Sequence, residues 1–106
     1  MRNMEEAVQA FIHAIKSSEE YLDYTREKDK VKQFPELKAQ IDEYRRRNYQ
    51  MQSSCDTAFE AIEQFEREYA DFRGIPMVED FLAAELAFCR LMQEVSLKVT
   101  ESLDFE

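Results

Sequence analysis

The chain has 106 residues, which predicts a single domain spanning residues 1–106. One glycine and two prolines are too few turn residues for a β-rich fold, and 44% hydrophobic residues argue against disorder. The net charge of −9 disfavours direct binding to nucleic acid or anionic lipid, and no apolar run approaches the roughly 20 residues that cross a bilayer. We therefore expect an all-α protein of the cytoplasm that does not insert into membranes.

Apolar residues at alternating steps of four and three predict a first helix over residues 4 to about 26. This seam includes Met4, Val8, Phe11, Ile15 and Leu22. The charged stretch 26–34 ends before a proline, which disfavours helical geometry in the residue preceding it. We expect a break or a loose single turn there.

A second helix is predicted over residues 35–72, with Pro35 at its first position. Its four-three alternation runs without a slip through Leu37, Ile41, Tyr44, Asn48, Met51, Cys55, Ala58, Ile62, Phe65, Tyr69 and Phe72. At 1.5 Å per residue, such a helix would be on the order of 55 Å long, far beyond the width of a compact domain of this size. It is expected to need partners along its whole length.

Gly74 and Pro76 predict the end of that helix and a tight reversal of the chain. A third helix over residues 76–103 follows, with a broad apolar face. The predicted fold class is all-α: a long antiparallel helical hairpin plus an N-terminal helix, forming a three-helix bundle completed by oligomerisation. Because the first and third helices cannot cover the whole second helix, its uncovered stripe predicts a homo-oligomer, most simply a dimer.

Residues that could carry chemistry are few. His13 is the only histidine and lacks the companions of known metal motifs, so we interpret it as a surface or boundary residue. A single glycine cannot build a phosphate loop or a nucleophile elbow. Cys55 and Cys89 are interpreted as small core residues, and two cysteines do not supply the four thiolates of an iron–sulfur cluster. The sequence therefore predicts no enzyme, no catalytic or metal-binding residue and no cofactor.

Polar residues on the seams need partners if they are buried. Glu85 lies on the third helix and requires an Arg or a Tyr hydroxyl, and Asn48 raises the same question on the second helix. Two interpretations stand: these residues fix register and oligomeric state, or Glu85 lies in a groove that receives a basic group from a partner protein. The cluster Arg45–Arg47 is interpreted as a solvated face paired with Asp42 and Glu43, in preference to a nucleic-acid site.

The candidate partner interface combines large and polar residues of the second and third helices. These residues are Asn48, Met51, Phe59, Phe65, Tyr69, Phe81, Glu85 and Phe88.

Three stretches, in this order and spacing, carry a family resemblance. The first is Ile15-Lys16-Ser17-Ser18-Glu19-Glu20-Tyr21. The second begins with Pro35-Glu36-Leu37 and continues with Ile41, Glu43, Tyr44, Arg45, Asn48 and Gln52. The third is Ile75-Pro76-Met77-Val78 with Phe81, Leu82, Ala84, Glu85 and Arg90, where Ile75 stands in place of the usual Asn. Together they resemble the YlbF/YmcA family of small bacterial helical regulators, which includes YheA-like proteins.

This resemblance implies an oligomeric helical scaffold that regulates competence, sporulation and biofilm formation. Related proteins are associated with a complex that adjusts the membrane-anchored endoribonuclease Y in mRNA processing. Some such complexes carry iron–sulfur clusters through cysteines, including ones in a C-terminal extension; this chain ends at Glu106, and we expect no cluster.

The favoured hypothesis is a non-enzymatic regulator that binds protein partners, including related family members. The alternative is a structural or chaperone-like helical oligomer that shields apolar client segments, and a third class is a small metal or cofactor binder.

Overall fold

The structure, a computed structural model, describes residues 2–53 and 59–104. Within these ranges the chain forms five α-helices and no strand: α1 (Arg2–Lys16), α2 (Glu19–Lys32), α3 (Pro35–Ser53), α4 (Phe59–Arg73) and α5 (Pro76–Ser102). The all-α fold class is confirmed, but five helices replace the three that the sequence predicted. Completion of the fold by oligomerisation stays a prediction.

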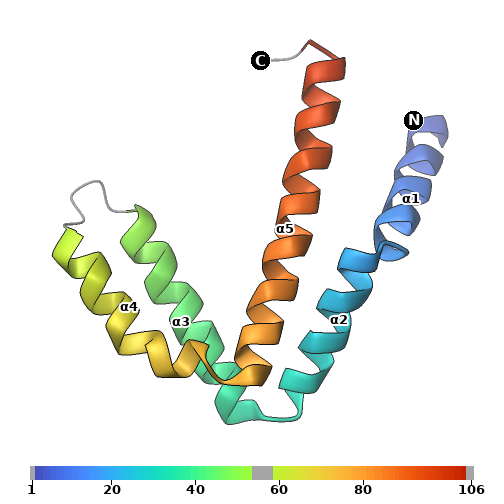
Figure 1. Ribbon diagram of the computed structural model, residues 1–106. Coiled ribbons are helices and arrows are strands. Elements are labelled where there is room, and N and C mark those ends of the chain that lie inside the picture. Colours follow the sequence, from blue (N-terminus) through green and yellow to red (C-terminus); the bar gives the residue numbers. More distant parts are fainter. Residues whose placement is uncertain (1, 54–58, 105–106) are drawn as a thin grey trace.

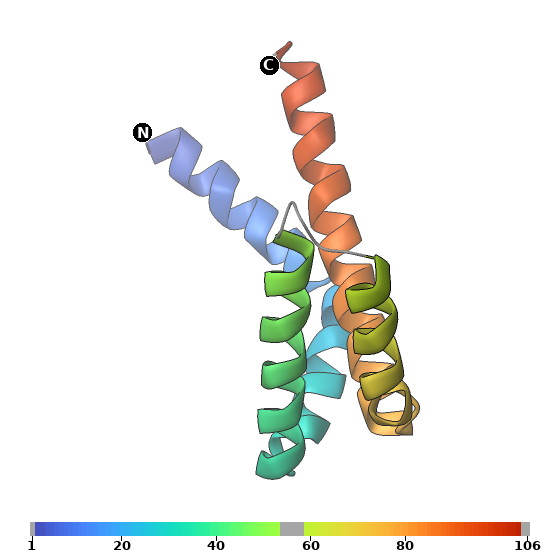
Figure 2. The ribbon, with the colours of Figure 1, turned by 90° about the vertical axis from the view of Figure 1, so that its left-hand side faces the viewer.

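The helices form two layers at one end of the molecule and diverge at the other. α2 and α5 pack side by side, and α3 and α4 lie across them as a second layer (Figures 1 and 2). α1 and the C-terminal half of α5 extend beyond these layers and lean apart (Figure 1). The radius of gyration is 17.5 Å, against about 13 Å for a compact domain of this length. The chain is therefore elongated, with much of its helical surface outside any core.

Two serines divide the predicted first helix into α1 and α2. Ser18 has an extended backbone and caps α2, since its Oγ accepts a hydrogen bond from the N–H of Tyr21 at 3.2 Å. The hydroxyl of Ser17 donates to the carbonyl oxygen of His13 at 2.9 Å. Side-chain bonds of this kind compete with helical geometry in consecutive serines. Glu19 and Glu20 then oppose the positive end of the α2 dipole.

α2 continues to Lys32, so the expected break from residue 26 onward is wrong. Ion pairs one helical turn apart support this charged stretch, namely Arg26–Asp23 at 2.8 Å and Lys30–Glu27 at 3.2 Å. α2 ends at Lys32, three residues before Pro35, in keeping with the restriction that proline places on the residue preceding it.

The predicted single helix over residues 35–72 is also wrong, because α3 and α4 fold back against each other (Figure 1). The ring centroids of Tyr44 and Phe65 are 5.6 Å apart, whereas a straight helix would separate these residues by about 30 Å. The four-three alternation of apolar residues is the same in one long helix and in two helices that form a hairpin with their apolar faces in contact, so the pattern does not distinguish the two. Cys55 and Ala58, which belong to that predicted seam, lie outside the described residues.

The reversal before α5 occurs where Gly74 and Pro76 predicted it, and α5 ends one residue before the expected limit. Gly74 does not adopt a positive φ. Its N–H donates to the carbonyl oxygens of Ala70 and Asp71 at 3.2 Å, and the N–H of Ile75 donates to Phe72 at the same distance. The proline at the start of α5 then fixes the first helical turn.

The core lies where α2, α3 and α5 meet. Its buried members are Val31, Ile41, Val78 and Phe81, and partly buried apolar residues pack against them: Tyr24, Leu37, Phe72, Met77 and Leu82. A second set of rings fills the space between α3 and α4, where Tyr44 contacts Phe65, Tyr69 and Phe72. Both sets lie in the layered end of the molecule, so α1 contributes nothing to them.

Candidate protein-binding surface

The apolar seam of α1 is exposed at Met4, Val8 and Phe11 and half-buried at Ile15. No residue of α1, all of which the structure describes, is buried. Met4, near the start of α1, is 62% exposed, whereas Val31, near the end of α2, is 3% exposed. Val8 and Phe11 lie on the same face of α1 as Met4 and are each 44% exposed. A helix this apolar on one face is usually packed against a partner.

The apolar residues of α5 also become more exposed toward the end of the molecule where α1 lies. Val78 and Phe81 at its start are buried, with Val78 0% exposed, whereas Val99 is 49% exposed and Leu103 is 72% exposed. Intermediate positions on this seam, such as Phe88, are half-buried. The apolar contact between the two ends of the chain therefore fades as α1 and α5 diverge (Figures 1 and 2).

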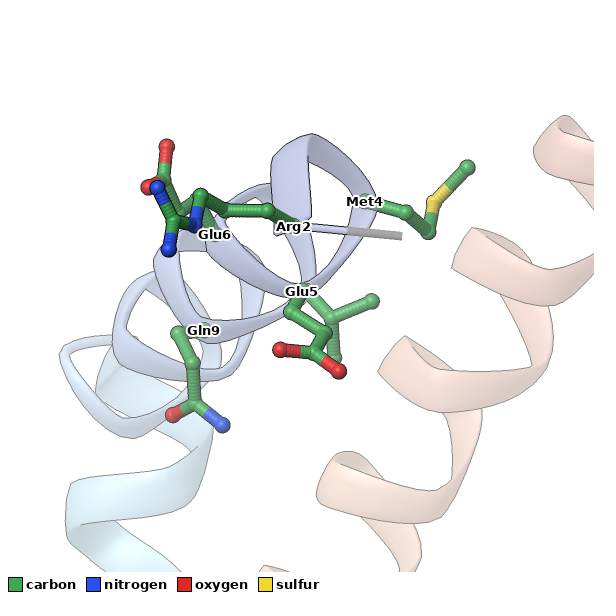
Figure 3. A pocket seen from close by; sticks show the side chains of 6 residues that line it. Arg2, Met4, Glu5, Glu6 and Gln9 are labelled. Carbon is green, nitrogen blue, oxygen red and sulfur yellow. The ribbon is translucent and has the colours of Figure 1, made fainter.

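These two exposed apolar faces, one on α1 and one on the end of α5, are taken together as one candidate surface. We call it the open seam and define it as Met4, Val8 and Phe11 of α1 with Val99 and Leu103 of α5. Met4 extends from α1 in the direction of α5, whereas Arg2 and Glu6 lie on the other side of the helix (Figure 3). A hollow of about 630 Å³ is lined by Arg2, Met4, Glu5, Glu6, Val8 and Gln9. Exposed apolar surface rimmed by charges marks association sites on proteins.

Four of the eight predicted interface residues share one hollow. Asn48 and Met51 of α3 and Phe65 and Tyr69 of α4 line a space of about 380 Å³ between these helices. Asn48 accepts a hydrogen bond from Gln52 at 3.4 Å. The structure therefore brings these four side chains together, by folding α4 back and not by placing them along one rod.

The other predicted interface residues lie elsewhere. Phe81 belongs to the core. Phe88 is half-buried and its ring stacks on Tyr24 at a centroid distance of 5.4 Å. Phe59 is exposed at the start of α4. Phe81 and Phe88 thus serve internal packing and do not present a free face.

Glu85 is half-buried, and Arg45 is its partner, one of the two residue types that the sequence predicted for it. The Arg45 guanidinium bridges Glu85 on α5 and Asp42 on its own helix, the latter at 2.8 Å. Burial lowers the pKa of Arg45, but the hydrogen bond to Asp42 and the charge of Glu85 outweigh it and raise that pKa above its usual value. The pair fixes α3 against α5, which matches the interpretation of Glu85 as a register residue.

Arg47 covers the aromatic set between α3 and α4. Its guanidinium donates to both carboxylate oxygens of Glu68, at 2.6 and 3.2 Å, and to the Tyr69 hydroxyl at 2.9 Å. It also lies 5.6 Å from the Phe65 ring centroid. The hydrogen bonds from Arg47 lower the pKa of Glu68. This clamp was missed because its partners lie 21 and 22 residues away in sequence.

The remaining pairs of the arginine cluster agree with the sequence. Arg46 pairs with Glu43 at 2.5 Å and Arg45 pairs with Asp42, both within α3. Sequence analysis predicted these pairs because residues three apart on a helix are neighbours. His13 is exposed, as expected.

The cysteine interpretation needs a correction. Cys89 is exposed on α5 and is not a core residue, and Cys55 lies outside the described residues. Among the described residues, no three His, Cys, Asp or Glu side chains gather as a metal ion would need. One exposed thiol does not fit an iron–sulfur cluster, which generally takes four thiolates, so we derive no chemistry through such a group.

Comparison with known proteins shows the family to which the chain belongs. The family model described as "Control of competence regulator ComK, YlbF/YmcA" matches residues 4–104. The chain belongs to the YlbF/YmcA family. Membership in this family supports a regulatory role, in agreement with the resemblance carried by residues of α1–α2, α3 and α5.

A curated relative extends the comparison. The UPF0342 protein of Caldicellulosiruptor bescii is 19% identical over 110 aligned residues, covering 100% of this chain and 92% of that protein. No solved structure matches the chain. In the described part of the chain, none of the helices combines the length and apolar character needed to span a bilayer.

Proposed function

We propose that this protein is a non-enzymatic cytoplasmic regulator that acts by binding other protein chains. The observation that carries the proposal is the open seam, an apolar surface that α1 and α5 leave uncovered outside the layered body. Burying such surface on a partner is the main favourable term in protein association.

A second copy of the chain is the first proposed occupant of the open seam. The seam consists of two apolar helical faces on one chain, so two copies related by a two-fold axis can each cover the other's faces. The elongated shape, with a radius of gyration of 17.5 Å, supports this because a compact core does not account for the apolar residues of α1.

Family membership supports a regulatory role. We propose that the protein acts in competence, sporulation and biofilm formation, together with related family members in a complex that influences endoribonuclease Y-dependent mRNA processing. Asn48, Met51 and Tyr69, which line the hollow between α3 and α4, are proposed as a second contact region for such partners.

Paired substitutions on the open seam test the proposal. Val8→Asp with Phe11→Asp places two charges on the exposed face of α1, and Tyr49→Asp places one on an exposed position of α3 as the control. Light scattering should give an oligomer for wild type and for the control, and a monomer for the open-seam variant. Circular dichroism should be unchanged in all three, because none of these residues is buried.

Tagged pull-downs from the native host extend the test to regulatory partners. Wild type and Tyr49→Asp should recover the same partner proteins, and the open-seam variant should lose them. The proposal fails if the wild type recovers no partner, or if the open-seam variant recovers the same set. Suppression of client aggregation without a stoichiometric partner would favour the chaperone-like alternative.

A further inference from the structure

A small cavity lies in the layered end of the molecule, away from the open seam. It measures about 190 Å³ and is formed by residues of α2, α3 and α5. Its apolar floor consists of Val31, Ile41 and Phe81, each of them buried in the core. A preformed apolar floor of this kind can hold a short hydrophobic group without rearranging the fold.

The rim of the cavity is cationic. Lys28 and Lys32 of α2 and Lys38 and Arg45 of α3 line it, with Asp42 as the only carboxylate among the lining residues that the structure describes. This contrasts with the whole chain, in which 23 acidic residues outnumber 14 basic ones. A local excess of positive charge in an otherwise acidic protein creates a field that attracts anions to that spot.

The charges on the rim are unequally neutralised. The Lys38 ammonium is 3.0 Å from Asp42, and Arg45 is shared between Asp42 and Glu85. Within the described residues, neither Lys28 nor Lys32 has a carboxylate within ion-pairing distance. Two cations are thus available to an anion from outside.

An aromatic face completes the site. The Lys28 ammonium lies 5.7 Å from the ring centroid of Tyr24, and that ring also lines the cavity. The Tyr24 ring also stacks on the ring of Phe88, with 5.4 Å between the ring centroids, and this contact holds the Tyr24 ring in place. A bound anion would therefore meet ammonium groups beside a fixed aromatic surface.

We propose that this cavity binds a small organic anion, a carboxylate or phosphate group carried on a short apolar or aromatic stem. The anionic head would lie at Lys28 and Lys32, and the stem would contact the Tyr24 ring and the apolar floor. The volume of about 190 Å³ is below the roughly 300–1,000 Å³ of sites for larger ligands, which favours a molecule the size of a single side chain. This proposal is independent of the open seam.

Titration of the full chain with phenyl phosphate and benzoate tests the site. Binding can be followed by amide nuclear magnetic resonance shifts and by tyrosine fluorescence, since the chain has no Trp. Benzyl alcohol supplies the stem without the charge, and inorganic phosphate supplies the charge without the stem. At least one of the two aromatic anions should give saturable shifts confined to residues 24–32, 37–45 and 78–82, with at least tenfold tighter binding than either control compound.

Matched lysine variants separate a built site from general attraction. Lys28→Gln with Lys32→Gln should weaken binding at least tenfold, whereas Lys16→Gln with Lys98→Gln removes the same charge elsewhere and should leave it unchanged. No saturation up to about 20 mM, a range that covers weak ligands with about ten non-hydrogen atoms, would overturn the proposal. Equal weakening by the two double variants would overturn it as well. If neither aromatic anion binds but capture of a partner protein depends on Lys28 and Lys32, the small-anion proposal is overturned. The ligand of these lysines would then be an acidic side chain of that partner.

Discussion

Truncation of Ile41 and of Phe11 to alanine separates core packing from the open seam. Ile41 is 1% exposed in the core, so Ile41→Ala removes three carbon atoms from a closed space. At about 0.8 kcal/mol for each buried methylene, plus the energy of the cavity left behind, the expected loss of unfolding free energy is about 2–5 kcal/mol. This is a large part of the roughly 5–15 kcal/mol that stabilises an ordinary domain.

Phe11→Ala has a different expected result. Phe11 is 44% exposed in the single chain, and alanine has a higher helix propensity than phenylalanine, so the unfolding free energy of the monomer should change by at most about 0.5 kcal/mol. If the open seam binds a second copy, the same substitution should lower the apparent stability increasingly as protein concentration rises, since association stabilises only the folded chain.

Urea unfolding followed by circular dichroism at about 1 and 100 µM distinguishes these outcomes, because only a folding equilibrium coupled to association depends on concentration. Ile41→Ala should shift the midpoint similarly at both concentrations. The reasoning is refuted if Ile41→Ala changes the unfolding free energy by less than about 1 kcal/mol. It is equally refuted if Phe11→Ala matches Ile41→Ala at the lower concentration.

Three further predictions concern single features. Gly74→Ala should leave the melting temperature unchanged or raise it slightly, because Gly74 lacks a positive φ and an added Cβ would meet its nearest atom at an ordinary 3.5 Å. Calorimetry showing a loss would contradict this. The pKa values of Asp42, lowered by Lys38 and by Arg45, and of Glu68, lowered by Arg47, lie below those of the unfolded chain. Their contribution is therefore complete above about pH 5, where both carboxylates are ionised in the unfolded chain as well, and is lost as the pH falls further. Melting curves from pH 7 to pH 2 should decline below that point, less steeply in an Asp42→Asn, Glu68→Gln variant and at high salt. Finally, the thiol of Cys89 should react with a colorimetric disulfide reagent in the native protein, and Cys89→Ser should abolish that reaction at this position.

Local chemistry explains which boundaries were predictable. Pro35, Gly74 and Pro76 mark ends and starts of helices within a few residues, because proline and glycine restrict or release the backbone irrespective of tertiary contacts. The cap at Ser18 is equally local, and the Ser-Ser-Glu-Glu stretch contained its signal. The sequence nevertheless predicted one continuous helix there, because the apolar four-three alternation continues through Ser18 from α1 into α2.

The return of α4 onto α3 could not be predicted from the same reasoning. Tyr44 and Phe65 lie on one unbroken apolar seam, and either a longer helix or a hairpin buries such a seam. Only the contact between their rings, 5.6 Å apart, distinguishes the two. The sequence predicted that Glu85 would need an Arg or a Tyr hydroxyl as its partner, but that this partner is Arg45 depends on how α3 crosses α5.

The exposed apolar surface lies on different helices from those that the sequence predicted, and the folding of α4 onto α3 explains the difference. Sequence analysis placed the excess apolar stripe on the second helix, which was expected to be longer than its neighbours. Because α4 folds back on α3, Tyr44, Phe65 and Tyr69 of that stripe contact one another, while Asn48 and Met51 line the hollow between the two helices. The excess then falls on α1 and on the last turns of α5.

The break at Ser17 and Ser18 connects the local chemistry to the proposed function. α2 packs along α5, so a straight continuation of α2 would carry α1 along the second half of α5 as well (Figure 2). The two serines instead end one helix and cap the next, and α1 leaves that line. The exposure of Met4 and Leu103 is thus a consequence of where the helix is interrupted, and a continuous helix would have closed the seam. A chain that interrupts an otherwise uniform apolar seam at this point leaves apolar side chains of α1 and α5 exposed while its core, at the other end, stays intact.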